Sequence, residues 1–260
     1  MKRTRISALP LWVPDEIASF AGGASIFDSS CSAEAKTYMI DKDEGYFLKC
    51  AEAGSLKREF EMATFFHKKG LGAEALLYLS GQKDFLLTKR VAGEDCTHPK
   101  YLEEPERLCD LLSERLRMLH EIKAEDCPIT DRTASYLALA DLNCKEGRYD
   151  LTFAYDEPFE SAKAAYEYLC ANRGALKNEV LLHGDYCLPN IILNDWRFSG
   201  FIDLGNGGIG DRHVDVFWGI WTLKFNLKTD RYKERFIDGY GRDLINVDTL
   251  RLIGAAEIFG

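Results

Sequence analysis

The sequence predicts an α+β protein of two lobes, with a strand-rich N-terminal lobe and a mostly helical C-terminal lobe. Short β-like runs separated by turn residues occupy about the first ninety residues. After Ala92-Gly93, leucines recur at helical spacing, as they do over residues 103–122. A small group of strand-like runs returns near residues 179–203. Strands that precede helices in this way are typical of α+β proteins.

The first part of the chain is expected to fold as hairpins around one helix. The helix is predicted over residues 55–69, because Ser55 is a suitable N-cap residue and Gly70 a suitable terminator. Turn residues at 41–45 and at 81–84 each join two consecutive strands. The predicted strands are residues 24–28, 36–40, 46–50, 75–80 and 85–91.

The second part is expected to contain helices around a short strand region. The predicted helices are residues 103–122, 131–144, 157–172, 212–227, 229–240 and 247–258. The predicted strands are residues 179–183, 190–194 and 198–203, the last two forming a hairpin through residues 195–197. The expected lobes are residues 1–92 and 93–260, with a hinge at about 88–92. A cleft between lobes is a usual place for a ligand site.

The composition excludes several classes of protein. The formal net charge of −9 over 260 residues argues against a nucleic-acid-binding protein, which usually has a basic face, and is compatible with a cationic small-molecule substrate. No apolar run approaches the roughly 20 residues of a membrane span. The N-terminal apolar run is short and broken by Pro10 and Pro14, so we expect no signal peptide. Eight scattered cysteines without a CxxC pair indicate a reducing, cytoplasmic environment.

Two motifs carry most of the chemical information. HGDYCLPN contains Asp185 and Asn190 directly behind an apolar run, and Asp203 follows in FIDLGNGG. Two carboxylates and an amide at strand ends allow four interpretations: a metal site, a hydrolytic acid pair, a phosphoryl-transfer site or ordinary turn chemistry. The offset of five between Asp185 and Asn190 is that of the protein-kinase catalytic loop, and Asp203-Leu204-Gly205 corresponds to D-F-G. This spacing favours phosphoryl transfer.

A kinase-like site also needs a lysine on an N-terminal strand and a glutamate on the following helix. Lys49 ends the apolar run Tyr46-Phe47-Leu48, and Glu59 lies ten residues later, near the start of the predicted helix. We expect Lys49 to bind nucleotide phosphates while Glu59 holds its ammonium in place. The loop at residues 28–34, which includes Ser32, is rich in small residues and is a candidate to cover the phosphates. An acid pair alone would not explain this lysine and glutamate.

These residues together make the sequence similar to the aminoglycoside phosphotransferases, most closely the aminoglycoside 3′-phosphotransferases. The resemblance covers almost the whole chain and is carried by four segments. They are Tyr46-Phe47-Leu48-Lys49, Lys57-Arg58-Glu59, HGDYCLPN and FIDLGNGGIGDRHVD. The last segment matches the family's I-D-x-G-x-x-G-x-x-D-x-x-x-D run. The resemblance implies a protein-kinase-like fold and a monomer or weak dimer.

The resemblance also implies roles for single residues. Asp185 would be the catalytic base, and Asn190 and Asp203 the Mg²⁺ ligands. The backbone of Lys89 and Val91 would hold the adenine of ATP, with GTP as the alternative donor. The acceptor would be the 3′-hydroxyl of a cationic aminoglycoside such as kanamycin, whose phosphorylation confers antibiotic resistance.

Acidic residues would bind the amines of such an acceptor. By the resemblance, the candidate substrate ligands are Asp156, Glu157, Glu257 and the chain end at Gly260. Leu188 and Asn206 stand where relatives usually carry an acid and an arginine. Two alternatives therefore stay open: a kinase of another hydroxyl compound, such as choline, homoserine, a macrolide or a sugar, and an inactive nucleotide-binding regulator.

Overall fold

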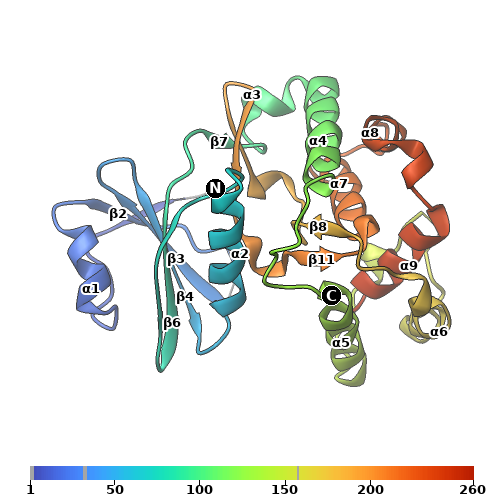
Figure 1. Cartoon of the computed structure of the whole chain (residues 1–260), viewed down its shortest axis with the longest axis horizontal. Helices are drawn as coiled ribbons and strands as arrows, with labels where there is room; N and C mark the ends of the chain where they lie inside the picture. The colour runs from blue at the N-terminus through green and yellow to red at the C-terminus, as the bar shows by residue number, and fades with distance from the viewer. Residues whose placement is uncertain (1–2, 32–33, 157) are drawn as a thin grey trace. The chain divides into compact units, whose positions relative to one another are not determined.

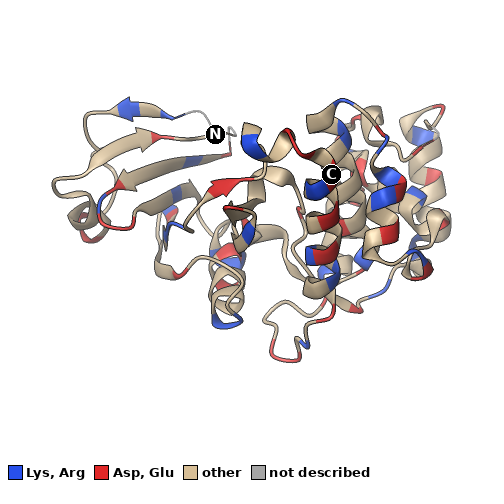
Figure 2. Cartoon of the chain, turned by 90° about the horizontal axis from the view of Figure 1, so that it is seen from above, with Lys and Arg blue, Asp and Glu red and all other residues tan. Residues whose placement is uncertain are grey.

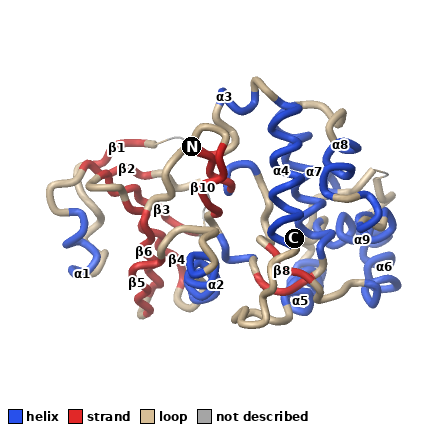
Figure 3. Tube along the Cα trace, turned by 45° about the horizontal axis from the view of Figure 1, so that its top comes forward, coloured by secondary structure: helices blue, strands red, loops and turns tan. Residues whose placement is uncertain are grey.

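The computed structural model describes residues 3–31, 34–156 and 158–260. The chain divides into two compact units, each of which draws on two separate stretches of sequence. Unit 1 comprises Met1–Asp95 and Pro189–Gly205, and unit 2 comprises Cys96–Leu188 and Asn206–Gly260. Figure 3 shows strands concentrated in the first unit and helices in the second. The predicted α+β, kinase-like fold is confirmed.

Unit 1 is built on an antiparallel sheet with the strand order β1-β2-β3-β4-β6-β5 (Figure 1). Its strands are β1 (Thr4–Ile6), β2 (Ser25–Asp28), β3 (Ala35–Asp41), β4 (Tyr46–Glu52), β5 (Ala75–Ser80) and β6 (Lys83–Lys89). Alternate apolar side chains of the central strands form the core, among them Ile40, Leu48 and Leu87. The helices of this unit are α1 (Asp15–Ala18) and α2 (Lys57–Lys68).

A hairpin from late in the chain completes unit 1. It consists of β9 (Ile191–Asn194) and β10 (Arg197–Phe201), and β9 also pairs with β7 (Glu94–Asp95). Asp195 and Trp196 form its turn with φ angles of 49° and 65°. Gly93 lets β7 approach β9, because a Cβ at its φ of +118° would lie 2.2 Å from the Leu193 carbonyl oxygen.

Unit 2 is mainly helical, and its longer helices are amphipathic or buried. The helices are α3 (Pro99–Leu102), α4 (Pro105–His120), α5 (Arg132–Lys145), α6 (Ala162–Asn172), α7 (Arg212–Leu227), α8 (Lys233–Tyr240) and α9 (Val247–Glu257). A two-stranded antiparallel sheet joins β8 (Val180–Leu182) to β11 (Gly208–Gly210). Figure 2 shows basic and acidic residues interspersed along the helices of this unit.

The structure differs from the sequence-based expectation at several element boundaries. The helix expected from residue 157 begins at Ala162, because the Ser161 side chain accepts a hydrogen bond from the Ala164 N–H and caps it there. The strand expected to end at residue 91 ends at Lys89. The hairpin at residues 189–205 belongs to unit 1 rather than to the helical unit. Among the described residues, no helix is both long and apolar enough to cross a membrane.

Candidate active site

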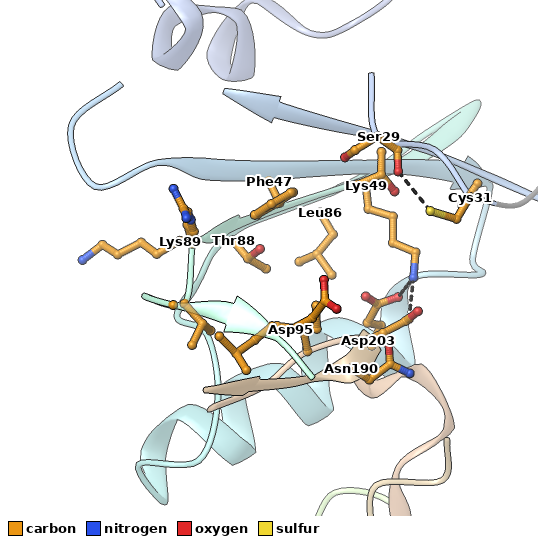
Figure 4. A pocket seen from close by; sticks show the side chains of 18 of the residues that line it. Ser29, Cys31, Phe47, Lys49, Leu86, Thr88, Lys89, Asp95, Asn190 and Asp203 are labelled. Carbon is orange, nitrogen blue, oxygen red and sulfur yellow. Dashed lines mark hydrogen bonds and ion pairs between the residues drawn. The ribbon is translucent and has the colours of Figure 1, made fainter. Parts of the chain in front are cut away.

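A pocket in unit 1 contains the charged residues that the sequence indicates for nucleotide binding. Its apolar lining includes Phe47, Leu86, Val91, Ile192 and Ile202. Lys49, Glu59, Asn190 and Asp203 also line it (Figure 4). The pocket therefore combines a flat apolar region with a cluster of polar groups, which is the usual character of a small-molecule site.

Lys49 lies between two carboxylates. Its ammonium is 2.7 Å from Glu59 Oε2 and 2.7 Å from Asp203 Oδ1. Strand β4 is central in the sheet, where Lys49 pairs with Thr37 on one side and Leu86 on the other. Because its backbone is held on both sides, the side chain has a fixed origin from which it extends toward Asp203 (Figure 4).

Burial and charge act in opposite directions on this lysine. Burial alone would lower the pKa of Lys49, but the negative charges of Glu59 and Asp203 raise it above its ordinary value. Burial raises the pKa of Glu59, the positive charge of Lys49 opposes this, and Asp203 adds to it. The ion pair expected from the ten-residue offset is therefore present, and Lys49 stays cationic.

Asn190 and Asp203 lie at the open end of the β9–β10 hairpin. The Ile202 N–H donates to the Asn190 carbonyl at 3.0 Å, which fixes the two strand ends beside each other. Asp203 has a left-handed backbone with a φ of 59°, which costs a non-glycine residue about 1 kcal/mol. In this conformation the Asp203 carboxylate accepts a hydrogen bond from the Lys49 ammonium. Strained residues of this kind cluster at functional sites.

The donors at the hairpin end suit Mg²⁺. Magnesium binds hard oxygen ligands, is held in proteins by one or two carboxylates, and takes its other ligands from water and phosphate. Asp203 offers a carboxylate and Asn190 an amide oxygen in one pocket. In the described part of the chain, no group of three or more His, Cys, Asp or Glu side chains is arranged to hold a metal. The donor set therefore fits an ion shared with a nucleotide rather than a protein-only cage.

The loop after β2 is ordered by its own polar groups. The Ser30 N–H donates to Asp28 Oδ1 at 2.9 Å, and Ser30 Oγ accepts from the Thr37 N–H at 3.0 Å. Ser29 lines the pocket, and within the described part of the chain its buried hydroxyl has no hydrogen-bond partner. Ser32, the predicted phosphate contact, lies outside the described residues.

The hinge candidates Lys89 and Val91 differ in their surroundings. The Lys89 ammonium is 2.6 Å from Glu74 Oε2, and its backbone N–H donates to the Glu74 carbonyl. The Lys89 side chain thus extends away from Lys49 (Figure 4). Val91 lines the pocket. Lys89 lines it as well, but its ammonium is held by Glu74, so Val91 supplies the apolar contact.

The second group of candidate residues lies in unit 2, on the loop after β8. His183 is fully buried, and its Nδ1 accepts a hydrogen bond from the Asp185 N–H at 3.2 Å. Asp215 on α7 accepts from the N–H groups of His183 and Gly184, each at 2.7 Å. His183 and Asp215 therefore both shape the loop that carries Asp185.

Asp215 is itself fixed by a buried network. His120 Nε2 lies 3.2 Å from Asp215 Oδ2, and His120 Nδ1 lies 2.8 Å from the Tyr240 hydroxyl. Arg212 Nη1 donates to the same hydroxyl at 3.3 Å. A buried carboxylate needs such partners, because an unsatisfied one costs several kcal/mol. The loop of Asp185 is therefore anchored to three helices through one side chain.

Gly184 allows a second anchor. At its φ of +84°, a Cβ would lie 1.8 Å from the Asn206 carbonyl oxygen, so only glycine fits there. The Asn206 carbonyl also accepts from Arg132 Nε at 2.8 Å, and Asn206 Oδ1 accepts from Arg132 Nη2 at 3.1 Å. Arg132 on α5 thus places its guanidinium beside Asn206.

Three contributors to this loop were not identified from the sequence. They are His120, Arg132 and Thr222, whose Oγ accepts the Leu188 N–H at 3.1 Å. Each lies on a helix far away in the sequence, and none stands in a motif of its own. Leu188 is fully buried, so its side chain packs in the core.

Glu257 is the best defined of the predicted substrate ligands. Its Oε1 accepts from the Tyr136 hydroxyl and from Trp218 Nε1, both at 2.9 Å. Burial raises the pKa of Glu257 to about 7; the two hydrogen bonds oppose this rise, and the charge of Asp185 adds to it. The charge of Asp185 therefore acts on the Glu257 carboxylate. Tyr136 and Trp218 donate the two hydrogen bonds that this carboxylate accepts.

The pH dependence of stability follows from this shift. Because the pKa of Glu257 is higher in the folded protein, about 7, than its ordinary value of 4.5, the folded state binds more protons between these values. Stability contributed by the neutral carboxyl is thus present below pH 4.5 and lost as the pH rises through 7. We expect Glu257→Gln to gain stability relative to the parent on going from pH 4.5 to pH 8, by at most about 3 kcal/mol.

Urea denaturation at both pH values measures this difference. Glu167→Gln, a change of the same kind at an exposed position on α6, is the control and should show little pH-dependent difference. A Glu257→Gln effect that is the same at pH 4.5 and pH 8 would contradict the expected titration.

The remaining substrate candidates are placed as follows. Asp156 is ion-paired with Lys233, whose ammonium lies 2.5 Å from Asp156 Oδ2. Gly260 is exposed and follows the buried Phe259. Glu157 lies outside the described residues.

Comparison with known proteins identifies clear relatives. The model of the phosphotransferase enzyme family matches residues 30–253. A probable aminoglycoside 3′-phosphotransferase of Lactococcus lactis is 49% identical over 248 residues, covering 95% of each chain. An aminoglycoside 3′-phosphotransferase of Niallia circulans is 30% identical over 210 residues, covering 79% of this chain and 80% of its own.

Solved structures show the same fold. An aminoglycoside 3′-phosphotransferase of type VIII matches with a TM-score of 0.79 at 22% identity, covering 95% of this chain and 98% of its own. An aminoglycoside phosphotransferase of Streptomyces rimosus in complex with ADP and streptomycin matches with a TM-score of 0.70 at 22% identity, covering 90% of each chain.

Proposed function

Because the chain belongs to the phosphotransferase enzyme family, among the aminoglycoside phosphotransferases, we propose that it transfers the γ-phosphate of ATP to the 3′-hydroxyl of an aminoglycoside. The protein is an enzyme that transfers phosphate to a hydroxyl group. The named relatives support the acceptor, and the solved relatives with ADP or AMP-PNP support the nucleotide.

One observation carries the nucleotide half of this proposal. Lys49 is held between Glu59 and Asp203 in a pocket that also contains Asn190. A buried ammonium with a fixed position is suited to bind phosphate oxygens, and its two carboxylate partners prevent it from moving away. The apolar part of the same pocket, near Phe47 and Val91, suits a purine base. ATP is the proposed donor, with GTP as the alternative.

Asn190 and Asp203 would hold Mg²⁺. When bound, this ion would neutralise charge on the phosphates. Two other parts of unit 1 would bind and shield the phosphates. Lys49 would bind phosphate oxygens, and the loop after β2 would exclude water from them. Lys89 and Val91 would position the base through their backbone.

Asp185 is the proposed base for the acceptor hydroxyl. In the chain it precedes Asn190 by five residues, the offset of a kinase catalytic loop. Its backbone is fixed by His183, and the neighbouring amides are fixed by Asp215. A carboxylate held in this way can accept the hydroxyl proton as the phosphate is transferred. We also propose a cytoplasmic monomer or weak dimer that confers aminoglycoside resistance.

An acceptor screen tests the proposal. The purified protein with ATP and Mg²⁺ is assayed for ADP release against kanamycin, neomycin, choline, homoserine and erythromycin. We expect release with kanamycin or neomycin, and phosphorus NMR of the product locates the modified hydroxyl. Release with only one of the other compounds would reject the aminoglycoside acceptor while retaining phosphoryl transfer. Nucleotide binding without release for any acceptor would instead favour an inactive regulator.

A further inference from the structure

The amines of an aminoglycoside need partners, and several expected carboxylates already have them. Asp156 is paired with Lys233, and Glu257 accepts two hydrogen bonds from protein groups. An aromatic ring face is a second kind of cation site, since its quadrupole attracts an ammonium placed over the ring. An exposed aromatic ring in unit 2 would supply such a site.

Helix α7 carries such a ring at Phe225. This residue is 54% exposed, whereas Phe217 on the same helix is buried. The Phe225 ring stacks on Trp221 with centroids 4.9 Å apart and an interplanar angle of 10°. Trp221 in turn stacks on Phe153 at 5.6 Å and contacts Trp218 at 5.3 Å. The exposed ring therefore has a rigid aromatic support.

An ammonium already occupies the vicinity of this ring. Lys228, the exposed residue that ends α7, places Nζ 4.2 Å from the centroid of the Phe225 ring. Lys228 has a left-handed backbone with a φ of 57°, and it directly follows the last helical residue. The ring face thus already contacts an ammonium, which belongs to an exposed lysine side chain.

Phe225 lies on the same helix as two residues that contact the surroundings of Asp185. On α7, Trp218 donates to Glu257, a neighbour of Asp185, and Thr222 accepts from Leu188 in the same loop. Phe225 follows Trp218 by seven residues, which is about 10 Å along the helix. An acceptor of several linked rings spans such a distance, so its reacting ring and a distal amine can reach both places.

We propose that the face of Phe225 covered by Lys228 binds an ammonium group on a distal ring of the acceptor, so that Phe225 is a specificity-determining residue and Lys228 its internal competitor. The proposal rests on the aminoglycoside acceptor of the proposed function. The cation is bound by the ring of Phe225, which stacks on Trp221, rather than by a further carboxylate. An acceptor without an amine would gain nothing from this site.

Four variants test the proposal, with kanamycin as the probe. Phe225→Leu keeps apolar volume but removes the ring, and we expect KM to rise about two- to five-fold with kcat nearly unchanged. Phe225→Tyr keeps a ring face and should resemble the parent. Lys228→Gln removes the competitor and should lower KM about two- to five-fold. Lys163→Gln is the matched control, because it removes the same charge from an exposed lysine on α6.

A double variant separates ring binding from a general charge effect. In Phe225→Leu, the additional Lys228→Gln change should no longer lower KM, because the site is gone. An equal effect of Lys228→Gln in both backgrounds, or an unchanged KM for Phe225→Leu, would overturn the proposal. If kanamycin is not phosphorylated at all, calorimetric binding decides: the same pattern in Kd supports the ammonium site although the proposed function fails, and no binding rejects both.

Discussion

Asp185→Asn is expected to lower kcat for ADP release by about 10²- to 10⁴-fold, the usual contribution of a general base. Asparagine has nearly the same shape but cannot accept the proton of the acceptor hydroxyl. The loop should keep its form, because the backbone N–H groups of His183, Gly184 and Asp185 anchor it. Steady-state ADP release with kanamycin measures the effect.

Two controls accompany this variant. Binding of ATP to Asp185→Asn, measured by calorimetry, should equal that of the parent, because Asp185 is not among the residues that line the nucleotide pocket. Asp110→Asn, a change of the same kind in an ion-paired residue of unit 2, should keep kcat near the parent value. If Asp185→Asn retained the parent kcat, Asp185 would not be the base.

Asp203→Asn is expected to act on the nucleotide instead. It removes the negative charge of one of the two carboxylates that hold the Lys49 ammonium, and it replaces a proposed carboxylate ligand of Mg²⁺ with a neutral amide. Hydrogen bonds to charged groups contribute about 1.5–3 kcal/mol, so the Kd of Mg·ATP should rise about 10- to 150-fold. Calorimetry with and without Mg²⁺ measures this, and the loss should be larger when Mg²⁺ is present.

The matched control for this variant is Glu61→Gln on α2, whose partner Lys57 lies at 3.9 Å on the surface. It removes the same charge from the same unit, and it should leave the Kd unchanged. Equal affinities of Asp203→Asn and the parent for Mg·ATP would exclude Asp203 as a ligand of the metal. A loss that is the same without Mg²⁺ would assign Asp203 to Lys49 alone.

Local sequence patterns predicted the parts of the site that are close together in the chain. The pairing of Lys49 with Glu59 followed from a strand, a turn and one helical turn, and the ion pair is present at 2.7 Å. The hairpin that brings Asn190 near Asp203 followed from two short apolar runs around a turn. In each case the geometry is set by neighbours within a few residues, so periodicity and turn chemistry determine it.

Long-range partners could not be predicted in this way. Strand β11 consists of Gly208-Ile209-Gly210, which has little intrinsic preference for a strand, and it forms one only because it pairs with β8. His120 and Arg132 reach the loops of Asp185 and Asn206 from helices far away in sequence. The pairing of Asp156 with Lys233 is equally distant, so the sequence could not show that this acid has a partner.

The composition of unit 1 has a consequence for synthesis on the ribosome. Strand β4, which carries Phe47 and Lys49, is made early. The other wall of the pocket follows more than a hundred residues later, with Asn190, Ile192, Ile202 and Asp203. Domains usually fold as units while the chain emerges. Here the sheet can form early, whereas the nucleotide pocket stays incomplete until Asp203 has been translated. Nascent chains that stop before residue 189 therefore carry Lys49 and Glu59 without a complete pocket.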